Sequence, residues 1–257
     1  MPYVTSGDLR IHYEVEGEGP PLVLHTGFVG AARDWYDLGY VDALKEDYLL
    51  ILPDPRGQGE SDKPHSTEAY AGEKRAQDVI AVLDALKIDR THFWGYSMGG
   101  GVGFQLAARH PERLISLVLG GAHPFGGPAN AAQAELFRQG MATALAAIEA
   151  ATSPLPPQLR NRWVTNDPEA MAAATLIERA NLEAYVGTIE LPTLMYCGDR
   201  DPIHEGAQKA ANAIGSATFV SLPGLNHIDG ILDKDAILPH VRAFLNRYAA
   251  SPVTTAP

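Results

Sequence analysis

The sequence contains little of several features on which other classes of protein depend. Among its 257 residues there is one cysteine, Cys197, which excludes an intramolecular disulfide and a cysteine-rich zinc site. Lys and Arg number 20 against 31 Asp and Glu, so the formal net charge is −11. A basic surface for nucleic acid or for an anionic membrane is therefore not expected. No apolar run approaches the roughly 18 residues of a membrane-spanning helix.

The rest of the composition is that of a globular protein. Hydrophobic residues make up 46% of the chain, which is too high for a disordered protein. The first residues, Met1–Asp8, lack the basic and then apolar order of a signal peptide, so we expect a cytoplasmic protein. We expect a monomer or homodimer, with neither nucleic acid nor a membrane as partner. The tail Ser251–Pro257 is expected to be disordered.

Short apolar runs alternate with helical patterns along most of the chain. The apolar runs are Pro21–His25, Tyr48–Leu52, Thr91–Trp94, Leu114–Leu119, Thr193–Cys197 and Ala217–Leu222, after two β-prone segments at Tyr3–Ser6 and Ile11–Val15. Helical patterns cover residues 68–86, 102–110, 205–214 and 237–248. This alternation predicts an α/β fold with a mostly parallel central sheet flanked by helices.

One segment breaks the alternation. Residues 123–187 carry no strand signal, and helices are expected over residues 131–151 and from Pro168 to about Tyr185. Three prolines separate these helices, at positions 154, 156 and 157. We therefore predict a core of residues 1–122 and 188–257, with an all-helical cap inserted at 123–187.

The sharpest local motif is Gly95-Tyr96-Ser97-Met98-Gly99. A serine on a tight strand-to-helix turn needs unusual backbone angles, and glycines two residues before and after it let the strand and helix approach closely. A strand is expected before this motif and a helix after it. The motif therefore predicts Ser97 as a nucleophile.

A nucleophilic serine needs a base, and the base needs an acid that orients it. His227 lies in the loop after the last predicted strand, and Asp199 and Asp201 lie in the loop after Thr193–Cys197. Both loops follow strands, where ligands bind in open α/β sheets. The chain order of serine, acid and histidine is that of hydrolases with this serine motif. The residues alone leave the choice between the two acids open.

With these motifs and the turn Asp54–Ser61, the sequence resembles the α/β-hydrolase superfamily over nearly its whole length, in particular small serine hydrolases with a helical cap. The resemblance implies the α/β-hydrolase fold. It also implies an acid three residues after a glycine, so that Gly198 points to Asp201. We interpret the turn at 54–61 as structural, with Asp54 and Arg56 bracing loops. We expect no cofactor and no metal site.

The resemblance also implies an oxyanion hole, in which two backbone N–H groups stabilise the charge that develops on a carbonyl oxygen. These are the amides of Met98 and Phe28. The sequence departs from the family here, since Thr26 stands where a histidine is common. Whether His25 or Thr26 takes over the bracing of this loop stays open.

Together these features predict an esterase or lactonase that cleaves a small carboxylic ester or lactone through an acyl-serine intermediate. We expect a neutral, partly apolar substrate. Candidates for the pocket wall are His123, Phe125, Trp163 and Ile228, and His204 is a further candidate for substrate contact. The same triad would serve a carbon–carbon bond hydrolase, a cofactor-free haloperoxidase or perhydrolase, or an amidase or lactamase. A ligand receptor on the same fold is the alternative outside enzymes.

Overall fold

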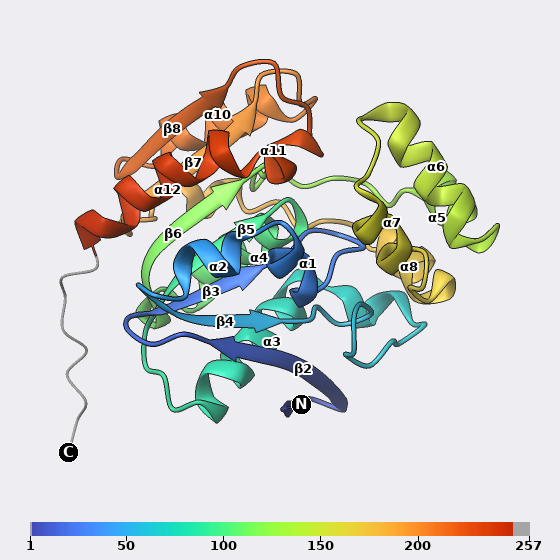
Figure 1. Ribbon diagram of the computed structural model, residues 1–257, viewed down its shortest axis with the longest axis horizontal. Helices are drawn as coiled ribbons and strands as arrows, with labels where there is room; N and C mark the ends of the chain where they lie inside the picture. Colours follow the sequence, from blue (N-terminus) through green and yellow to red (C-terminus); the bar gives the residue numbers. More distant parts are fainter. Residues whose placement is uncertain (1, 249–257) are drawn as a thin grey trace.

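The central sheet has eight strands in the order β1-β2-β4-β3-β5-β6-β7-β8 (Figure 1). The computed structural model describes residues 2–248, so the tail expected to be disordered lies outside the described residues. The strands are β1 (Tyr3–Ser6), β2 (Leu9–Glu16), β3 (Pro21–His25), β4 (Leu49–Pro53), β5 (Thr91–Tyr96), β6 (Leu114–Gly120), β7 (Thr193–Gly198) and β8 (Ala217–Leu222). β2 runs antiparallel to its neighbours β1 and β4, and the strands from β4 to β8 are parallel. The predicted fold class is confirmed.

Helices cover both faces of the sheet because successive side chains of a strand point to opposite sides. Phe93 of β5 packs in a cluster with α3 (Gly72–Ala85), α4 (Met98–Arg109) and α10 (His204–Ala213). The next residue, Trp94, packs on the other face with α1 (Ala32–Asp37), α2 (Tyr40–Leu44) and α12 (Lys234–Tyr248). Strands buried on both faces explain the continuous apolar runs of the sequence.

Several helix boundaries differ from the predicted ones. The pattern at 68–86 begins as the 3-10 helix η1 (Thr67–Tyr70) and becomes helical again only at α3, because Ala71 has an extended ψ of 142°. The predicted helix at 102–110 already begins at Met98, directly after the serine. The short helices α1, α2 and α11 (Asp229–Leu232) and the 3-10 helix η2 (Pro111–Arg113) were not predicted, since so few residues show no helical periodicity.

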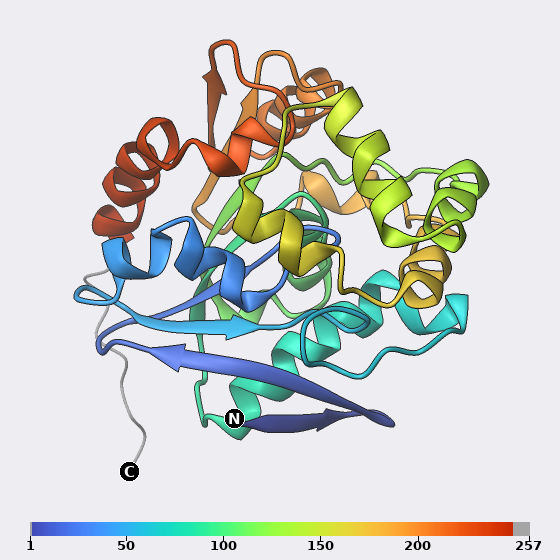
Figure 2. The same ribbon diagram turned by 45° about the vertical axis from the view of Figure 1, so that its right-hand side comes forward.

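Between β6 and β7 the chain forms α5 (Ala131–Arg138), α6 (Met141–Ala151), α7 (Pro157–Trp163), α8 (Pro168–Thr175) and α9 (Glu183–Val186). The helix predicted at 131–151 is broken at Gly140, whose φ of 114° no α-helix accommodates. The helix predicted from Pro168 ends ten residues early, at Thr175. Helices α5 to α8, called the cap here, lie beyond the carboxyl ends of the parallel strands (Figures 1 and 2). The exact division between core and cap stays a prediction.

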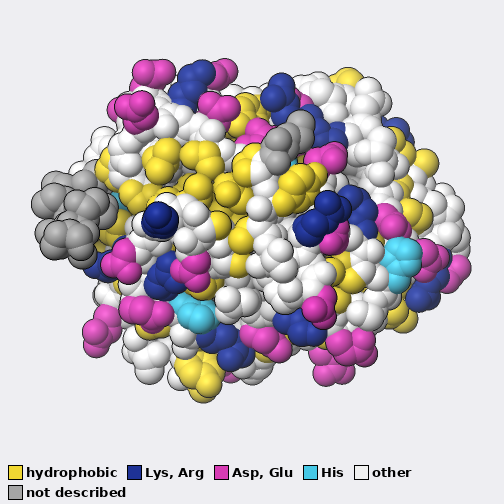
Figure 3. Space-filling model, turned by 90° about the horizontal axis from the view of Figure 1, so that it is seen from below, with side chains coloured by type: hydrophobic (Ala, Val, Ile, Leu, Met, Phe, Trp, Pro, Cys, Tyr) yellow, Lys and Arg dark blue, Asp and Glu magenta, His cyan; other side chains and the backbone are white. Residues whose placement is uncertain are grey.

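The cap packs against the core through its own apolar cluster. Phe137 and Met171 from the cap meet Val29, Tyr70 and Ile228 from the core in this cluster. On the face seen in Figure 3, Lys and Arg side chains are interspersed with Asp and Glu. Among residues 2–248 there is no helix with the length and hydropathy that crossing a membrane requires.

Candidate active site

Ser97 occupies the turn that connects β5 to α4. Its φ of 53° and ψ of −113° lie outside the regions that a non-glycine residue prefers. The flanking glycines are required by close packing. A Cβ atom on Gly95 would lie 2.2 Å from the carbonyl oxygen of Gly99, and one on Gly99 would lie 2.3 Å from that of His25. The spacing of the motif thus follows from the steric demands of the turn.

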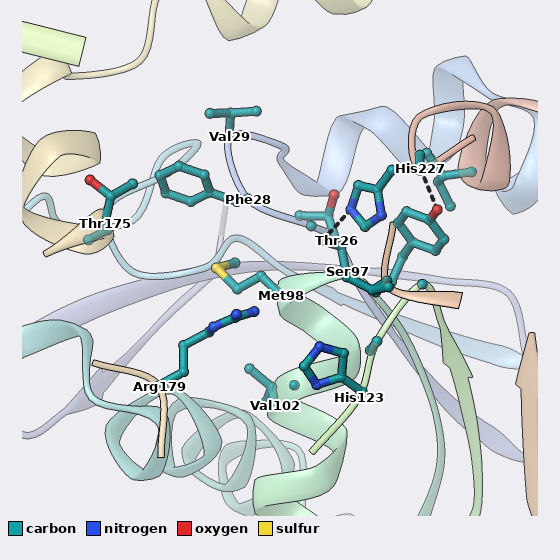
Figure 4. Close-up of a pocket in the computed structure, with 18 of the residues that line it drawn as sticks. Thr26, Phe28, Val29, Ser97, Met98, Val102, His123, Thr175, Arg179 and His227 are labelled. Atoms are coloured by element: carbon teal, nitrogen blue, oxygen red, sulfur yellow. Dashed lines mark hydrogen bonds between the residues drawn. The ribbon is translucent and has the colours of Figure 1, made fainter. Parts of the chain in front are cut away.

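The structure brings Ser97, His227 and Asp201 together from three separate loops. His227 Nε2 lies 2.8 Å from Ser97 Oγ (Figure 4), and His227 Nδ1 lies 2.6 Å from Asp201 Oδ2. The three groups form one hydrogen-bonded chain from hydroxyl to imidazole to carboxylate. Such a chain is able to move a proton from the serine to the imidazole.

Asp201 is held in its charged form. Burial by itself raises the pKa of the Asp201 carboxyl. The hydrogen bond and charge of His227, together with the backbone N–H of Ile203, outweigh burial and leave this pKa below its ordinary value. At neutral pH an ionised Asp201 therefore faces the Nδ1 side of the imidazole.

The other acid of the same loop has a different position. Asp199 is exposed, and its Oδ1 accepts a hydrogen bond of 2.7 Å from the backbone N–H of Gly224. This contact ties the loop after β7 to the turn after β8. The structure therefore places Asp201, and not Asp199, against His227.

Two residues that the sequence did not single out hold the His227 loop. The hydroxyl of Tyr96 donates to the backbone oxygen of His227 at 2.5 Å. Asn226 Oδ1 accepts from the backbone N–H groups of Ile228 and Asp229 at 2.9 and 3.1 Å. Tyr96 stands at a variable position of the serine motif, so its identity carried no signal. Asn226 precedes the histidine directly, and only that adjacency could have drawn attention to it.

The predicted oxyanion amides belong to the two segments that flank Ser97, namely the loop after β3 and the first residue of α4. The loop carrying Phe28 approaches so closely that a Cβ atom on Gly27 would lie 3.4 Å from Ser97 Cβ. Met98 is the first residue of α4, where helix N-termini present unpaired N–H groups. Among the described residues neither amide donates a hydrogen bond to a protein acceptor. Both donors are thus available to a bound molecule.

Gln58 braces the loop at 26–30. Its Nε2 donates to the carbonyl oxygens of Gly27 and Gly30 at 3.1 and 2.6 Å, and its Oε1 accepts from the Val29 N–H at 3.2 Å. His25 instead contacts the carbonyl oxygen of Thr26 at 3.1 Å, and burial lowers its pKa to about 4, so it is neutral at pH 7. The main bracing group therefore comes from the turn at 54–61 and not from position 25 or 26.

The other residues of that turn also hold loops, in line with the structural interpretation. Asp54 Oδ1 accepts from the Ala32 N–H at 2.7 Å, while its Oδ2 lies 2.8 Å from His12 Nδ1. Arg56 forms a buried ion pair with Asp78 at 2.6 Å. Gln58 is the member of this turn that sequence reasoning missed, although the motif containing it was identified.

A pocket of about 840 Å³ opens over Ser97 between the core and the cap. All four predicted wall residues line it, namely His123, Phe125, Trp163 and Ile228. His204 does not line it, because its Nε2 lies 2.8 Å from Ser221 Oγ on the exposed side of β8. Two arginines that the sequence did not indicate, Arg75 and Arg179, also line the pocket. Within residues 2–248, His, Cys, Asp and Glu form no group of three suited to a metal ion.

Comparisons with known proteins find relatives and solved structures that are similar to this chain. The putative carbamate hydrolase RutD of Pseudomonas syringae pv. syringae is 29% identical, over 92% of this chain and 98% of that protein. The putative carbamate hydrolase RutD of Azorhizobium caulinodans is 34% identical, but the match spans only 46% of this chain and 43% of that relative. The crystal structure of the enol-lactonase from Burkholderia xenovorans LB400 superposes with a TM-score of 0.85 at 28% identity, covering 95% of this chain and 100% of that one.

The family profile described as alpha/beta hydrolase fold matches residues 20–171, which is more than half of the chain. This match includes Ser97, its strand and helix, and the loops that carry Phe28 and Gln58. The chain therefore belongs to the alpha/beta hydrolase family and is a hydrolase of that superfamily.

Proposed function

We propose that this protein is a serine hydrolase that cleaves a small carboxylic ester or lactone through an acyl-Ser97 intermediate. The observation that carries the proposal is the unbroken chain Ser97–His227–Asp201, which opens into a pocket beside two available amides. The similarity to an enol-lactonase supports it, since a lactone is a cyclic ester.

In the first half of the reaction, Ser97 Oγ attacks the carbonyl carbon of the substrate while its proton passes to His227 Nε2. Asp201 accepts a hydrogen bond from His227 Nδ1, which fixes the tautomer and stabilises the imidazolium. The N–H groups of Phe28 and Met98 donate to the oxyanion. Collapse of the tetrahedral intermediate expels the alcohol, which takes the proton from His227.

In the second half, water attacks the acyl-Ser97 carbonyl carbon and gives its proton to His227. The carboxylic acid leaves when the Ser97 oxygen regains that proton. With a lactone the alcohol and the acid are parts of one molecule, so the product is a single hydroxy acid. The apolar wall formed by Phe125, Trp163 and Ile228 would select the acyl or alcohol part.

A second candidate is hydrolysis of a carbamate. It is favoured by the name of the Pseudomonas syringae relative, whose match extends over nearly both chains. A carbamate offers the same carbonyl carbon to Ser97, with nitrogen as an additional substituent. The geometry around Ser97 and His227 serves both substrates, so the pocket wall and the leaving group would decide between them.

The test is steady-state turnover of a panel of p-nitrophenyl esters, lactones, carbamates and amides by the wild-type protein and by Ser97→Ala. We expect turnover of esters or lactones and a fall in kcat of roughly 10⁶-fold in the variant, the size seen when the nucleophile of a serine protease is removed. A fluorophosphonate should add its mass to Ser97. Equal rates in both proteins would refute the nucleophile, preferred turnover of carbamates would select the second candidate, and saturable binding without turnover would indicate a receptor.

A further inference from the structure

Arg75 and Arg179 line the pocket without an ion-pair or hydrogen-bond partner among residues 2–248. Arg75 belongs to α3, and Arg179 lies between α8 and α9. Among the described residues neither guanidinium takes part in an ion pair or donates a hydrogen bond to a protein acceptor. The chain is strongly acidic, so unpaired arginines in its main pocket are unexpected.

Arg56, on the same side of the core, provides the contrast with Arg75. Arg56 donates to both carboxylate oxygens of Asp78 at 2.7 and 2.6 Å, and also to the backbone oxygens of Ala69 and Lys74. Asp78 lies one helical turn after Arg75, yet its carboxylate is paired with Arg56 and not with Arg75. Arg75 instead has the ring of Tyr70 at 5.5 Å, and its Nε is buried without a hydrogen-bond partner.

Arg75 nevertheless remains a cation. Burial lowers the pKa of its guanidinium to about 10, which leaves it protonated at pH 7. Arg75 is half-buried, and a charge that has lost part of its hydration without gaining a partner destabilises a folded protein. When such a group faces a pocket, a ligand of opposite charge is the partner that would compensate it.

Arg179 reaches the pocket from the cap side. Its backbone pairs with Gly127 through hydrogen bonds of 2.9 and 3.2 Å, and a Cβ atom on Gly127 would lie 2.4 Å from Arg179 Nη2. The missing side chain at Gly127 therefore leaves space for the guanidinium. Figure 4 shows the side chain of Arg179 extending into the pocket beside Met98 and Val102.

Helix α4 connects this region to Ser97. Met98, Gly101, Val102 and Gln105 line the pocket, and their spacing places them on one helix face. Gly72, one turn before Arg75, lies against Gln105, since a Cβ atom there would be 2.6 Å from Gln105 Nε2. Gln105 is eight residues after Ser97, which is roughly 12 Å along a helix axis. The two arginines thus belong to an arm of the pocket that follows α4.

The acidic groups of the pocket do not neutralise this arm. Of the carboxylates that line it, Asp34 is paired with Arg162, and Asp201 is bonded to His227. The third, Glu178, is exposed and forms no ion pair among the described residues. Three arginines of the wall also lack an ion pair among the described residues, namely Arg75, Arg179 and the exposed Arg200 of the loop after β7. Three unpaired positive charges exceed the one unpaired negative charge of Glu178, so the net unpaired charge on the wall is positive.

We propose that this arm binds a carboxylate group of the substrate, with Arg75 and Arg179 as its counter-charges, while the ester or lactone carbonyl lies at Ser97. The inference rests on the proposed function and narrows its substrate to carboxylate-bearing esters or lactones. A guanidinium presents paired N–H donors that match the two oxygens of a carboxylate. This proposal differs from the neutral, partly apolar substrate that the sequence leads one to expect.

The test compares monomethyl esters of linear dicarboxylic acids, from succinate to suberate, with the corresponding dimethyl esters. The two series differ in one charge at the same chain length. We expect the wild-type protein to prefer the monoesters, with an optimum at one chain length. Arg75→Met and Arg179→Gln should each lower the ratio of kcat/KM for monoester to diester at least tenfold, mainly by raising KM for the monoester.

The matched control is Arg138→Gln, which removes the same charge from an exposed arginine of α5 that does not line the pocket. The ratio of kcat/KM for monoester to diester in Arg138→Gln should equal that of the wild-type protein. An unchanged ratio in both pocket variants, or an equal fall in Arg138→Gln, would overturn the proposal. Thermal unfolding checks the fold, and Arg75→Met should keep or raise the midpoint because it removes an unpaired, half-buried charge. If Arg75→Met does not fold, the exposed Arg179→Gln decides the test.

Binding of free adipate, measured by calorimetry on the Ser97→Ala protein, separates this proposal from the proposed function. Affinity that falls at least tenfold when Arg75→Met or Arg179→Gln is added supports the anionic arm even if no ester is hydrolysed. Ester hydrolysis with no preference between monoesters and diesters would retain the serine hydrolase and refute the arm. Affinity that is unaffected by either substitution refutes the arm as well.

Discussion

The core and the cap fix the side chains that they bring to the pocket in different ways. Ser97, Asp201 and His227 of the core lie on loops at strand ends, and each loop is tied to a neighbouring segment by a hydrogen bond. The N–H of Ser97 donates to the Gly120 oxygen, the loop of Asp201 is tied to Gly224 through Asp199, and the His227 oxygen accepts from Tyr96 at the end of β5. Besides its apolar cluster, the cap is joined to the core by a few polar side chains. Its links are the ion pairs of Arg162 with Asp34 and Asp37, and the hydrogen bonds Trp163–Asp34, Asn166–Val29, His65–Asp167 and Ser153–Asn226.

This difference indicates that the core positions the reacting groups and that the cap selects the substrate. Proton transfer and oxyanion binding depend on distances that tolerate errors of a few tenths of an ångström, so they need groups held on a rigid sheet. Selection of a substrate needs only a wall of suitable shape and charge. We therefore expect substitutions in the catalytic loops of the core to lower kcat and substitutions in the cap to act on KM.

The largest effect is expected for Asp201→Asn, which keeps the shape of the side chain and removes its charge. An asparagine in this position favours the wrong imidazole tautomer, and kcat should fall about 10⁴-fold, as in serine proteases. KM should change little. The measurement is steady-state turnover of the ester found for the wild-type protein, together with thermal unfolding to confirm an intact fold.

Asp199→Asn is the matched control, two residues away on the same loop. Its side chain is exposed and supports only the turn at Gly224. We expect kcat within about threefold of the wild-type value. A large loss in Asp199→Asn with a small one in Asp201→Asn would show that the wrong acid has been assigned.

The core was the part that the sequence could reveal. The Gly-x-Ser-x-Gly spacing reflects close packing around the serine turn. A Cβ atom on Gly95 would lie 2.2 Å from Gly99 of the same turn, and one on Gly99 would lie 2.3 Å from His25 of the neighbouring strand β3. The apolar runs of the strands likewise report burial on both sheet faces. The bracing role of Gln58 was not predicted, because its three hydrogen-bond partners lie about thirty residues earlier in the chain and no local sequence pattern indicates that contact.

The cap and the arginines show what local patterns cannot decide. Alanine-rich sequence around Gly140 supports a helix on both sides, so one long helix was predicted where the structure has two. Arg75 and Asp78 are three residues apart, a spacing that favours an ion pair on a helix. In the folded protein Asp78 pairs with Arg56 instead. The lack of a partner for Arg75 could therefore not be predicted from the sequence and is seen only in the structure.

An intermediate effect is expected for Gln58→Ala, which tests whether the core fixes geometry through its loops. The substitution removes three hydrogen bonds from the loop at 27–30 but leaves the Phe28 N–H in place. A displacement of that donor by about 1 Å should lower kcat on the order of 10- to 100-fold, with KM nearly unchanged. Gln139→Ala, an exposed glutamine beside α5, serves as the control and should leave kcat unaltered. Wild-type kcat in Gln58→Ala would show that the loop keeps its position without this side chain.

The smallest effect is expected for Arg162→Met, which breaks the main ionic link between the cap and the core. Asp34 is buried, and burial already raises its pKa, so without Arg162 it keeps only the Trp163 N–H and the Ala31 N–H as donors. Helix α7, which carries the pocket residues Leu159 and Trp163, should then shift more freely over the pocket. We expect KM to rise about 3- to 10-fold, equivalent to about 1 kcal/mol, with kcat within about twofold.

His65→Ala provides the comparison for the polar links between cap and core. It removes a link of the exposed His65, the 2.9 Å pair with Asp167. Exposed pairs contribute about 0–1 kcal/mol, so this variant should change KM less than about twofold. A graded response, with Arg162→Met larger than His65→Ala and both confined to KM, would mean that the cap only shapes the pocket. If kcat fell in Arg162→Met as far as in Gln58→Ala, the cap would have to help position the reacting groups. The link through Asn226, which joins Ser153 of the cap to the His227 loop, would then be the route by which it does so.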